Sequence, residues 1–143
     1  MTPSFLVRTC GWKDAADELR RIRYDVFVIE QRVPEVLEWD AADADSIHAL
    51  ATDTEGAPIG CARLLADGHI GRVAVVRQWR TLGVGTALML HLIDKAAARG
   101  DRQVIVNAQV AAMAFYERHG FRASGDVFEE AGIAHRVMTR DLS

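Results

Sequence analysis

The chain has 143 residues, which suits one domain with a single core, so we predict one domain over residues 1–143. Half of the residues are hydrophobic and 26% are charged, which excludes disorder as the main description of the chain. The formal net charge is -3, and this excludes a basic field that would attract nucleic acid or an anionic membrane surface.

The first predicted elements are a short strand and an amphipathic helix. Residues 4–9 (SFLVRT) have the composition of a strand, and a helical pattern begins after Gly11. Asp14 is placed to cap the start of this helix. Residues 30–46 are acidic and interrupted by a proline, so they predict short helical turns and loop. The apolar stripe of the helix recurs at spacings of 3, 4 and 3 and consists of Leu19, Ile22, Val26 and Ile29.

The next part of the chain predicts an antiparallel meander of three strands. The strands are expected at residues 47–52, 59–65 and 70–76. Asp67-Gly68 is a strong hairpin signal between the second and the third of them.

The second half predicts a crossover followed by a pair of strands. A helix is expected from Gly83 to Arg99 with a glycine cap, then a strand at 104–106 and a second helix at 110–119. The last two strands are expected at 121–127 and 135–139. A strand, a helix and a further strand in this order place the two strands roughly parallel. The whole pattern predicts a mixed α+β fold with one largely antiparallel sheet covered by helices.

The cysteines and the N-terminus predict a cytoplasmic protein without a metal. Cys10 and Cys61 lie far apart, without a CxxC spacing or clustered histidines, which argues against a disulfide scaffold and a zinc site. The first residues carry no secretory pattern, and no apolar run approaches the length of a membrane span.

The most informative motif is a glycine-containing turn that leads into the helix predicted from Gly83 to Arg99. Arg80 lies three residues before Gly83, and Gly85 follows where the helix begins. The first turn of a helix has free N–H groups and partial positive charge, and glycine lets a phosphate approach them closely. This arrangement predicts a diphosphate site. The alternative is that the two glycines only permit a tight turn, since the spacing is neither that of a P-loop nor that of a dinucleotide fingerprint.

A second motif lies on the next helix. Ala112, Phe115, Tyr116 and His119 fall on one helical face. The simple interpretation is structural, with Phe115 and Phe121 in the core and the hydroxyl of Tyr116 at its rim. The order of the two motifs along the chain favours a functional interpretation.

Together these motifs resemble the GCN5-related N-acetyltransferases (GNAT), which use acetyl-CoA. Arg80-x-x-Gly83-x-Gly85 is similar to the pyrophosphate motif of the family, and the segment 112–121 (AMAFYERHGF) is similar to its later motif. The segment 23–31 (RYDVFVIEQ), the strand that contains His48 and the turn 129–135 (EEAGIAH) resemble the ElaA-like branch of the family.

The resemblance implies a twisted sheet whose fourth and fifth strands, here 70–76 and 102–108, splay apart. It implies that Tyr116 protonates the departing coenzyme A thiolate, a role that suits a phenol with a pKa near 10. The pantetheine arm of acetyl-CoA is then expected on the backbone of Val73, Ala74 and Val75. Its diphosphate is expected on Arg80, Thr81, Leu82, Gly83, Val84, Gly85 and Thr86.

One position departs from the family pattern. Many members carry Asn seven residues before the tyrosine, whereas this chain has Gln109 there and Asn107 two residues earlier. Gln109 can make similar hydrogen bonds on a longer arm, so we include it in the expected acetyl-CoA site.

The acceptor amine must be neutral when it attacks, so a base or a water chain has to remove its proton. Glu30, His48, His69 and His135 are candidates for the base or the acceptor site, and each also has a plain structural explanation. The acidic stretch 35–45 either steers a cationic amine or is a solvated surface. The identity of the base stays open.

The sequence therefore predicts an N-acetyltransferase that moves an acetyl group from acetyl-CoA to a primary amine by direct attack, without a metal. The acceptor is expected to be a small molecule or a peptide amine, and homodimers, which are common in the family, are a further possibility. The alternative is a non-catalytic module that binds or senses coenzyme A.

Overall fold

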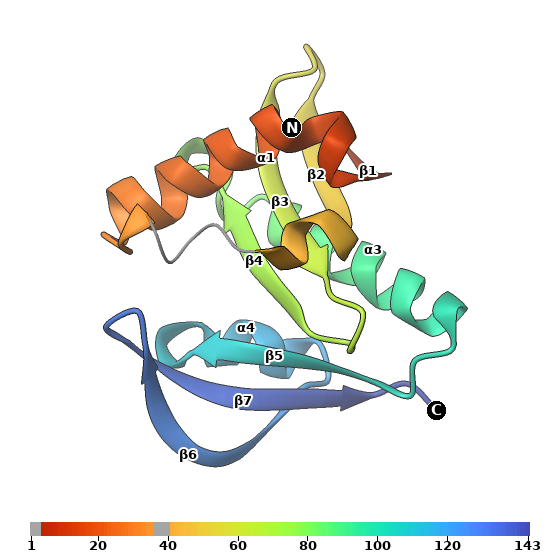
Figure 1. The fold of residues 1–143 in the computed structure, drawn as a ribbon, viewed down its shortest axis with the longest axis vertical. Helices are drawn as coiled ribbons and strands as arrows, with labels where there is room; N and C mark the ends of the chain where they lie inside the picture. The colour runs from red at the N-terminus through yellow and green to blue at the C-terminus, as the bar shows by residue number, and fades with distance from the viewer. Residues whose placement is uncertain (1–3, 36–40) are drawn as a thin grey trace.

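The computed structural model describes residues 4–35 and 41–143 (Figure 1). Its first elements are β1 (Phe5–Cys10), α1 (Trp12–Arg23), the π-helical segment η1 (Tyr24–Glu30) and the 3-10 turn η2 (Ala41–Asp45). The middle of the chain forms β2 (Ile47–Asp53), β3 (Pro58–Leu64), β4 (Ile70–Val75), the 3-10 turn η3 (Arg77–Trp79) and α3 (Val84–Arg99). The last elements are β5 (Gln103–Gln109), the 3-10 turn η4 (Val110–Ala112), α4 (Met113–Arg118), β6 (Arg122–Glu130) and β7 (Ile133–Asp141).

The strands form two hydrogen-bonded sheets instead of the one sheet that periodicity predicted. One sheet has the order β1-β2-β3-β4 and the other has the order β5-β7-β6. They meet at a single parallel bridge between His69 and Ile105, close to where β4 and β5 begin. Figure 1 shows the two strands diverging from this end. The splayed mixed α+β fold that the family resemblance implied is therefore confirmed, and the bridge has the parallel direction expected of the crossover.

The four-stranded sheet contains the predicted meander, with β1 added antiparallel to β2 at its outer edge. Because successive residues of a strand face opposite sides, the two faces of β2 belong to two different cores. Ala49 and Ala51 pack in the core that contains α3, and Leu50 packs in the core that contains α1. The two helices therefore cover opposite faces of this sheet.

The first helix differs from the prediction in its second half. Leu19, Ile22 and Val26 are buried as expected, but Ile29 is 59% exposed. The chain changes from α to π geometry at Tyr24, and the amide of Gln31 donates to the carbonyl of Val26, five residues back, at 3.1 Å. A π-helix has more residues per turn, so the phase of the apolar stripe is lost after Val26.

The predicted cap at the start of α1 was wrong. The N-cap is Gly11, with no side-chain capping bond, and Asp14 lies in the first turn. The backbone amide of Asp14 donates to the carbonyl of Gly11 at 3.2 Å. A carboxylate in the first turn still interacts favourably with the helix dipole.

The crossover helix α3 follows its predicted pattern. Its buried stripe includes Met89, Leu92, Ile93 and Ala96, and it ends at Gly100, whose φ of 92° gives the left-handed cap. The later helix is shorter than expected, since η4 occupies the first part of residues 110–119 and α4 the rest. None of the helices in the described residues is long and apolar enough to cross a membrane.

A buried charge cluster anchors η2 to the sheet and to α1. Oδ1 of Asp43 accepts hydrogen bonds from Arg23 and from Arg63, both at 2.8 Å. The acidic stretch 35–45 is therefore not a uniformly solvated surface, although its residues 36–40 lie outside the described residues. Both cysteines are buried, and neither forms a disulfide with the other.

Candidate active site

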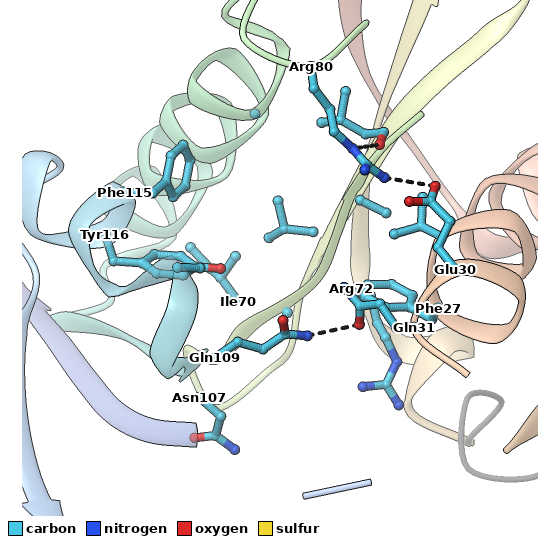
Figure 2. Close-up of a pocket in the computed structure, with 17 residues that line it drawn as sticks. Phe27, Glu30, Gln31, Ile70, Arg72, Arg80, Asn107, Gln109, Phe115 and Tyr116 are labelled. Carbon is cyan, nitrogen blue, oxygen red and sulfur yellow. Dashed lines mark hydrogen bonds and ion pairs between the residues drawn. The ribbon is translucent and has the colours of Figure 1, made fainter. Parts of the chain in front are cut away.

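A cavity of about 410 Å³ opens where the two sheets separate (Figure 2). Four parts of the chain build its walls: β4, the π-helical segment η1, the end of β5, and α4. It also reaches Arg80 and Gly85 at the start of α3. The cavity therefore connects the open edge of β4 with the N-terminus of a long helix.

The wall formed by β4 presents backbone as well as side chains. Among the described strands, β4 pairs only with β3, apart from the bridge at its start, so its other edge is open. Cys61 pairs with Ala74 and Arg63 pairs with Gly71, which leaves one extra residue in β4. This bulge places Arg72 at a φ of 50° and changes the direction of the strand. The predicted residues Val73, Ala74 and Val75 all line the cavity.

The predicted diphosphate loop forms the N-terminus of α3. Gly83 is the N-cap, at a φ of 90° that favours glycine. The amide of Ala87 donates to the carbonyl of Gly83 at 3.0 Å. The amides of Val84, Gly85 and Thr86 come before this bond in the first turn, where a helix has no internal acceptors for them. This end of α3 therefore has the geometry of an anion site.

Only part of that loop touches the cavity itself. Arg80 and Gly85 line it, and a Cβ on Gly85 would lie 3.6 Å from the ring of Phe115. The hydroxyl of Thr86 contacts Nε2 of His119 at 3.3 Å. The loop residues that do not line the cavity are Thr81, Leu82, Gly83, Val84 and Thr86.

Tyr116 presents its hydroxyl to the cavity from α4. The residue is 9% exposed, and its ring packs edge-on against Phe115 and Phe121. Figure 2 shows the phenol oxygen pointing into the space between α4 and β4. Burial raises the pKa of Tyr116 to about 12. The side chain is therefore a neutral proton donor at physiological pH.

Glu30 and Arg80 form an ion pair at the edge of the cavity. Nη2 of Arg80 donates to Oε1 of Glu30 at 2.9 Å, and Nε of Arg80 donates to the carbonyl of Val75 at 2.9 Å. Arg77 lies 3.7 Å from the other carboxylate oxygen. The hydrogen bond from Arg80 lowers the pKa of Glu30. This carboxylate is consequently a weak base, which does not favour Glu30 as the group that deprotonates an amine.

Gln109 crosses the cavity to η1 (Figure 2). Its Nε2 donates to Oε1 of Gln31 at 2.9 Å, so the amide pair connects the end of β5 with the end of the π-helical segment. Asn107, two residues earlier on the same face of β5, also lines the cavity. Gln109, which stands where many family members have Asn, therefore has Gln31 as a hydrogen-bond partner.

The structure places the candidate histidines in three different environments. His48 is buried, its Nε2–H donates to the carbonyl of Asp43 at 2.8 Å, and its ring lies against Trp12. His69 contacts Asp67 in the hairpin before β4. Neither residue lines the cavity. His135 lies in a neighbouring cavity of about 310 Å³, which also contains Gln109.

Several residues of the site were not predicted as functional. Phe27, Gln31 and Arg72 line both cavities. The signal for Phe27 and Gln31 was present, since both belong to the segment 23–31 that resembles the ElaA-like branch. Arg72 gave no signal, because a β-bulge depends on the register between strands. Among the described residues, no group of His, Cys, Asp and Glu side chains is arranged to hold a metal ion.

Comparison with known proteins identifies the class to which this site belongs. The family model described as an acetyltransferase (GNAT) domain matches residues 14–142. YjcF of Bacillus subtilis (strain 168), described as an uncharacterized N-acetyltransferase, is 39% identical over 124 residues, which cover 84% of this chain and 88% of YjcF. The chain therefore belongs to the GNAT family of acetyltransferases, and it is an acyl-CoA-dependent acyltransferase.

Solved structures agree with this assignment. An acyl-CoA N-acyltransferase from Pseudomonas aeruginosa superposes with a TM-score of 0.84 at 31% identity, covering 96% of this chain and 99% of that protein. ElaA of Escherichia coli superposes with a TM-score of 0.84 at 28% identity, covering 96% of this chain and 100% of ElaA. The similarity to the ElaA-like branch is thus confirmed.

Proposed function

We propose that the protein transfers an acetyl group from acetyl-CoA to a primary amine by direct attack of the amine on the thioester. The observation that carries this proposal is the position of Tyr116, whose buried hydroxyl points into the cavity that the open edge of β4 lines. A neutral phenol at this place can protonate a departing thiolate. The open edge provides backbone groups for an extended ligand in the same cavity.

The residues around the cavity suit the separate parts of acetyl-CoA. The backbone of Val73–Val75 would hold the pantetheine arm, and an amide of this strand would polarise the thioester carbonyl. The first turn of α3, together with Arg80, would bind the diphosphate, because N–H groups, dipole and guanidinium all favour an anion there. Gln109 completes the proposed acetyl-CoA site from β5. Fixed donors of this kind act without reorganisation during the reaction.

The role of Arg80 requires an exchange of partners. Its guanidinium is bonded to Glu30, and both side chains are partly exposed. Ion pairs of this type contribute little to stability, so a diphosphate can compete for the guanidinium. Glu30 is then released toward the edge of the cavity. We propose that the carboxylate holds Arg80 in position before acetyl-CoA binds.

The direct experiment is incubation of the protein with acetyl-CoA and a panel of primary amines, followed by detection of free thiol and by mass spectrometry of the products. The proposal expects thiol release that depends on one class of amine, with a mass increase of that amine by one acetyl group. Tight binding of acetyl-CoA without transfer to any amine would instead favour a non-catalytic module that binds coenzyme A.

Tyr116→Phe tests the assigned proton donor. Positioned acids contribute roughly 100-fold to 10,000-fold, so we expect kcat to fall by about 100-fold or more, while the affinity for acetyl-CoA changes little. Tyr24→Phe is the matched control, because Tyr24 is the other tyrosine and lies exposed outside the cavity. Equal kcat values for the two variants would remove Tyr116 from the mechanism.

A further inference from the structure

The cavity that contains His135 adjoins the cavity proposed for acetyl-CoA, and the two have lining residues in common. The two cavities share Phe27, Gln31, Arg72 and Gln109. His135 pairs directly with Gln109 between β7 and β5, so both side chains project from the same face of that sheet. The second cavity is therefore placed where a molecule could meet the contents of the first.

A hydrogen bond fixes the tautomer of the neutral His135 side chain. Its Nδ1 lies 2.7 Å from the carbonyl oxygen of Ile133. A carbonyl oxygen can only accept, so Nδ1 carries the hydrogen, and a neutral imidazole then has its lone pair on Nε2. The ring of Phe128 stacks on the imidazole at 5.8 Å and restricts its orientation. The basic nitrogen of His135 is thus held in one direction.

That nitrogen faces a carboxylate instead of a donor. Nε2 of His135 lies 3.6 Å from Oε2 of Glu130. Two acceptors this close together form a natural site for a group with several N–H donors, such as a primary ammonium.

The lining restricts the kind of amine that fits. Among the described residues, its charged side chains are Glu130 from β6 and Arg72 from β4, whereas Phe27 of η1 and the adjoining Gln31 are uncharged. The single carboxylate of this described lining can neutralise one ammonium. Val33 and Ile133 add apolar surface. The cavity of about 310 Å³ therefore suits a small amine with one positive charge and an apolar body.

We infer that this second cavity is the acceptor site and that His135 is the base that deprotonates the acceptor, an inference that rests on the proposed acetyl transfer. The ammonium gives one proton to Nε2 of His135, and the neutral amine attacks the thioester carbon. The new C–N bond forms and the C–S bond breaks, with the electron pair on sulfur. The sulfur takes its proton from Tyr116. The second proton of the amine nitrogen and the proton on His135 pass to solvent, from which Tyr116 is reprotonated.

The test compares two acceptors in a His135→Gln variant. 2-Phenylethylamine is protonated at neutral pH and needs a base, whereas O-methylhydroxylamine is already neutral and does not. We expect the rate with 2-phenylethylamine to fall by about 100-fold or more, and the rate with O-methylhydroxylamine to change by less than about threefold. His69→Gln is the matched control, since His69 lines neither cavity, and it should leave both rates unchanged.

The outcomes separate a chemical role from a structural one. An equal loss of both rates, or no loss of either, would overturn the assignment of His135. Binding of acetyl-CoA, measured by calorimetry, should be the same in His135→Gln and in the unaltered protein, which also shows that the variant is folded. If the unaltered protein binds acetyl-CoA and transfers acetyl to no amine of the panel, the proposed function fails. Transfer to other amines of the panel but to neither of these two would overturn the proposed acceptor site alone.

Glu130→Gln tests the acceptor site independently of the base. The side chain of Glu130 is half exposed, so this change spares the fold. We expect KM for 2-phenylethylamine to rise about tenfold with little change in kcat, and we expect spermidine to be a poor acceptor for the unaltered protein. Glu129→Gln is the matched control, because the neighbouring residue does not line the cavity. Equal KM values for the two variants, or efficient transfer to spermidine, would overturn the proposed acceptor class.

Discussion

Among the described residues, Asp43 and Glu30 each lie against two guanidinium groups, and these two clusters lie in opposite environments. Asp43 is buried between Arg23 and Arg63, and all three side chains are hidden from solvent. Glu30 binds Arg80 at the edge of the cavity, where the two side chains are 24% and 39% exposed. The chemistry of the two contacts is the same, but the solvent around them differs.

This difference decides what each cluster can do. A buried charge that loses its partner has neither water nor another ion to replace it, so the Asp43 cluster is fixed once the chain has folded. Water and salt can replace either partner of the exposed pair, so Arg80 can change partners at little cost. One cluster therefore holds the fold together, and the other leaves a cation available for a ligand.

The largest expected effect is on stability and comes from Asp43→Ala. The change leaves two buried guanidinium groups without this carboxylate, and removing one partner of a buried ion pair costs about 3–5 kcal/mol. Denaturant unfolding measures the free energy difference. Asp45→Ala, in the same turn but exposed, should stay within about 0.5 kcal/mol of the unaltered protein. Similar losses for the two variants would contradict the structural role of the Asp43 cluster.

The next effect is on ligand affinity and comes from Arg80→Gln. A hydrogen bond to a charged group contributes about 1.5–3 kcal/mol, so we expect acetyl-CoA to bind about 10-fold to 100-fold more weakly. Isothermal titration calorimetry gives the dissociation constant. Arg77→Gln should have a smaller effect, because Arg77 is more exposed and does not line the cavity. A larger loss from Arg77→Gln would show that the wrong cation was assigned to the diphosphate.

The buried His48 should make the free energy of unfolding depend on pH. Burial lowers the pKa of His48 from its ordinary value of 6.5. The unfolded chain therefore takes up a proton near pH 6.5 while the folded chain does not, so stability falls as the pH drops below this value. We expect His48→Gln to flatten the dependence of the unfolding free energy between neutral pH and pH 5. An equally steep curve in the variant would assign the acid sensitivity to other groups.

The smallest effect should come from Glu30→Gln. Because the bond from Arg80 lowers the pKa of Glu30, the pair contributes stability above the ordinary carboxyl pKa of 4.5, and this contribution is lost as the pH falls through the lowered value. For a pair this exposed we expect at most about 1 kcal/mol, and less at high salt. Unfolding at two salt concentrations checks both points. A loss comparable to that of Asp43→Ala would remove the contrast between the clusters.

The sequence predicted the elements whose cause is local. The stripe of α3, its glycine cap and the meander strands all follow from spacing and turn residues within short windows. The Asp43 cluster escaped prediction, because each of its arginines lies 20 positions away and an acidic loop gives no sign of buried partners. The separation into two sheets could not be read from periodicity either. Only the family resemblance indicated it.

The sequence was more informative about which motif residues share a cavity than about the contacts that they make. The family resemblance assigned Tyr116, Gly85 and the middle of β4 to one ligand, and these residues line one cavity. The bond between Gln109 and Gln31 joins residues 78 positions apart, so no local pattern could reveal it. Glu30 was a candidate base from its residue type alone, whereas its bond to Arg80 depends on the tertiary fold.

The π-helical segment η1 behaves as if one residue had been inserted into the helix that α1 begins. It carries Phe27 and Glu30 to the cavity, and Gln31 follows directly after its last residue. Deleting one residue near Asp25 would restore regular α geometry, and each later side chain would turn by about 100° around the helix axis. The fold could survive such a shortening, because α1 would keep its packing, yet the ligand-facing wall would be lost. Deletion of this one residue should therefore abolish catalysis while the chain still folds.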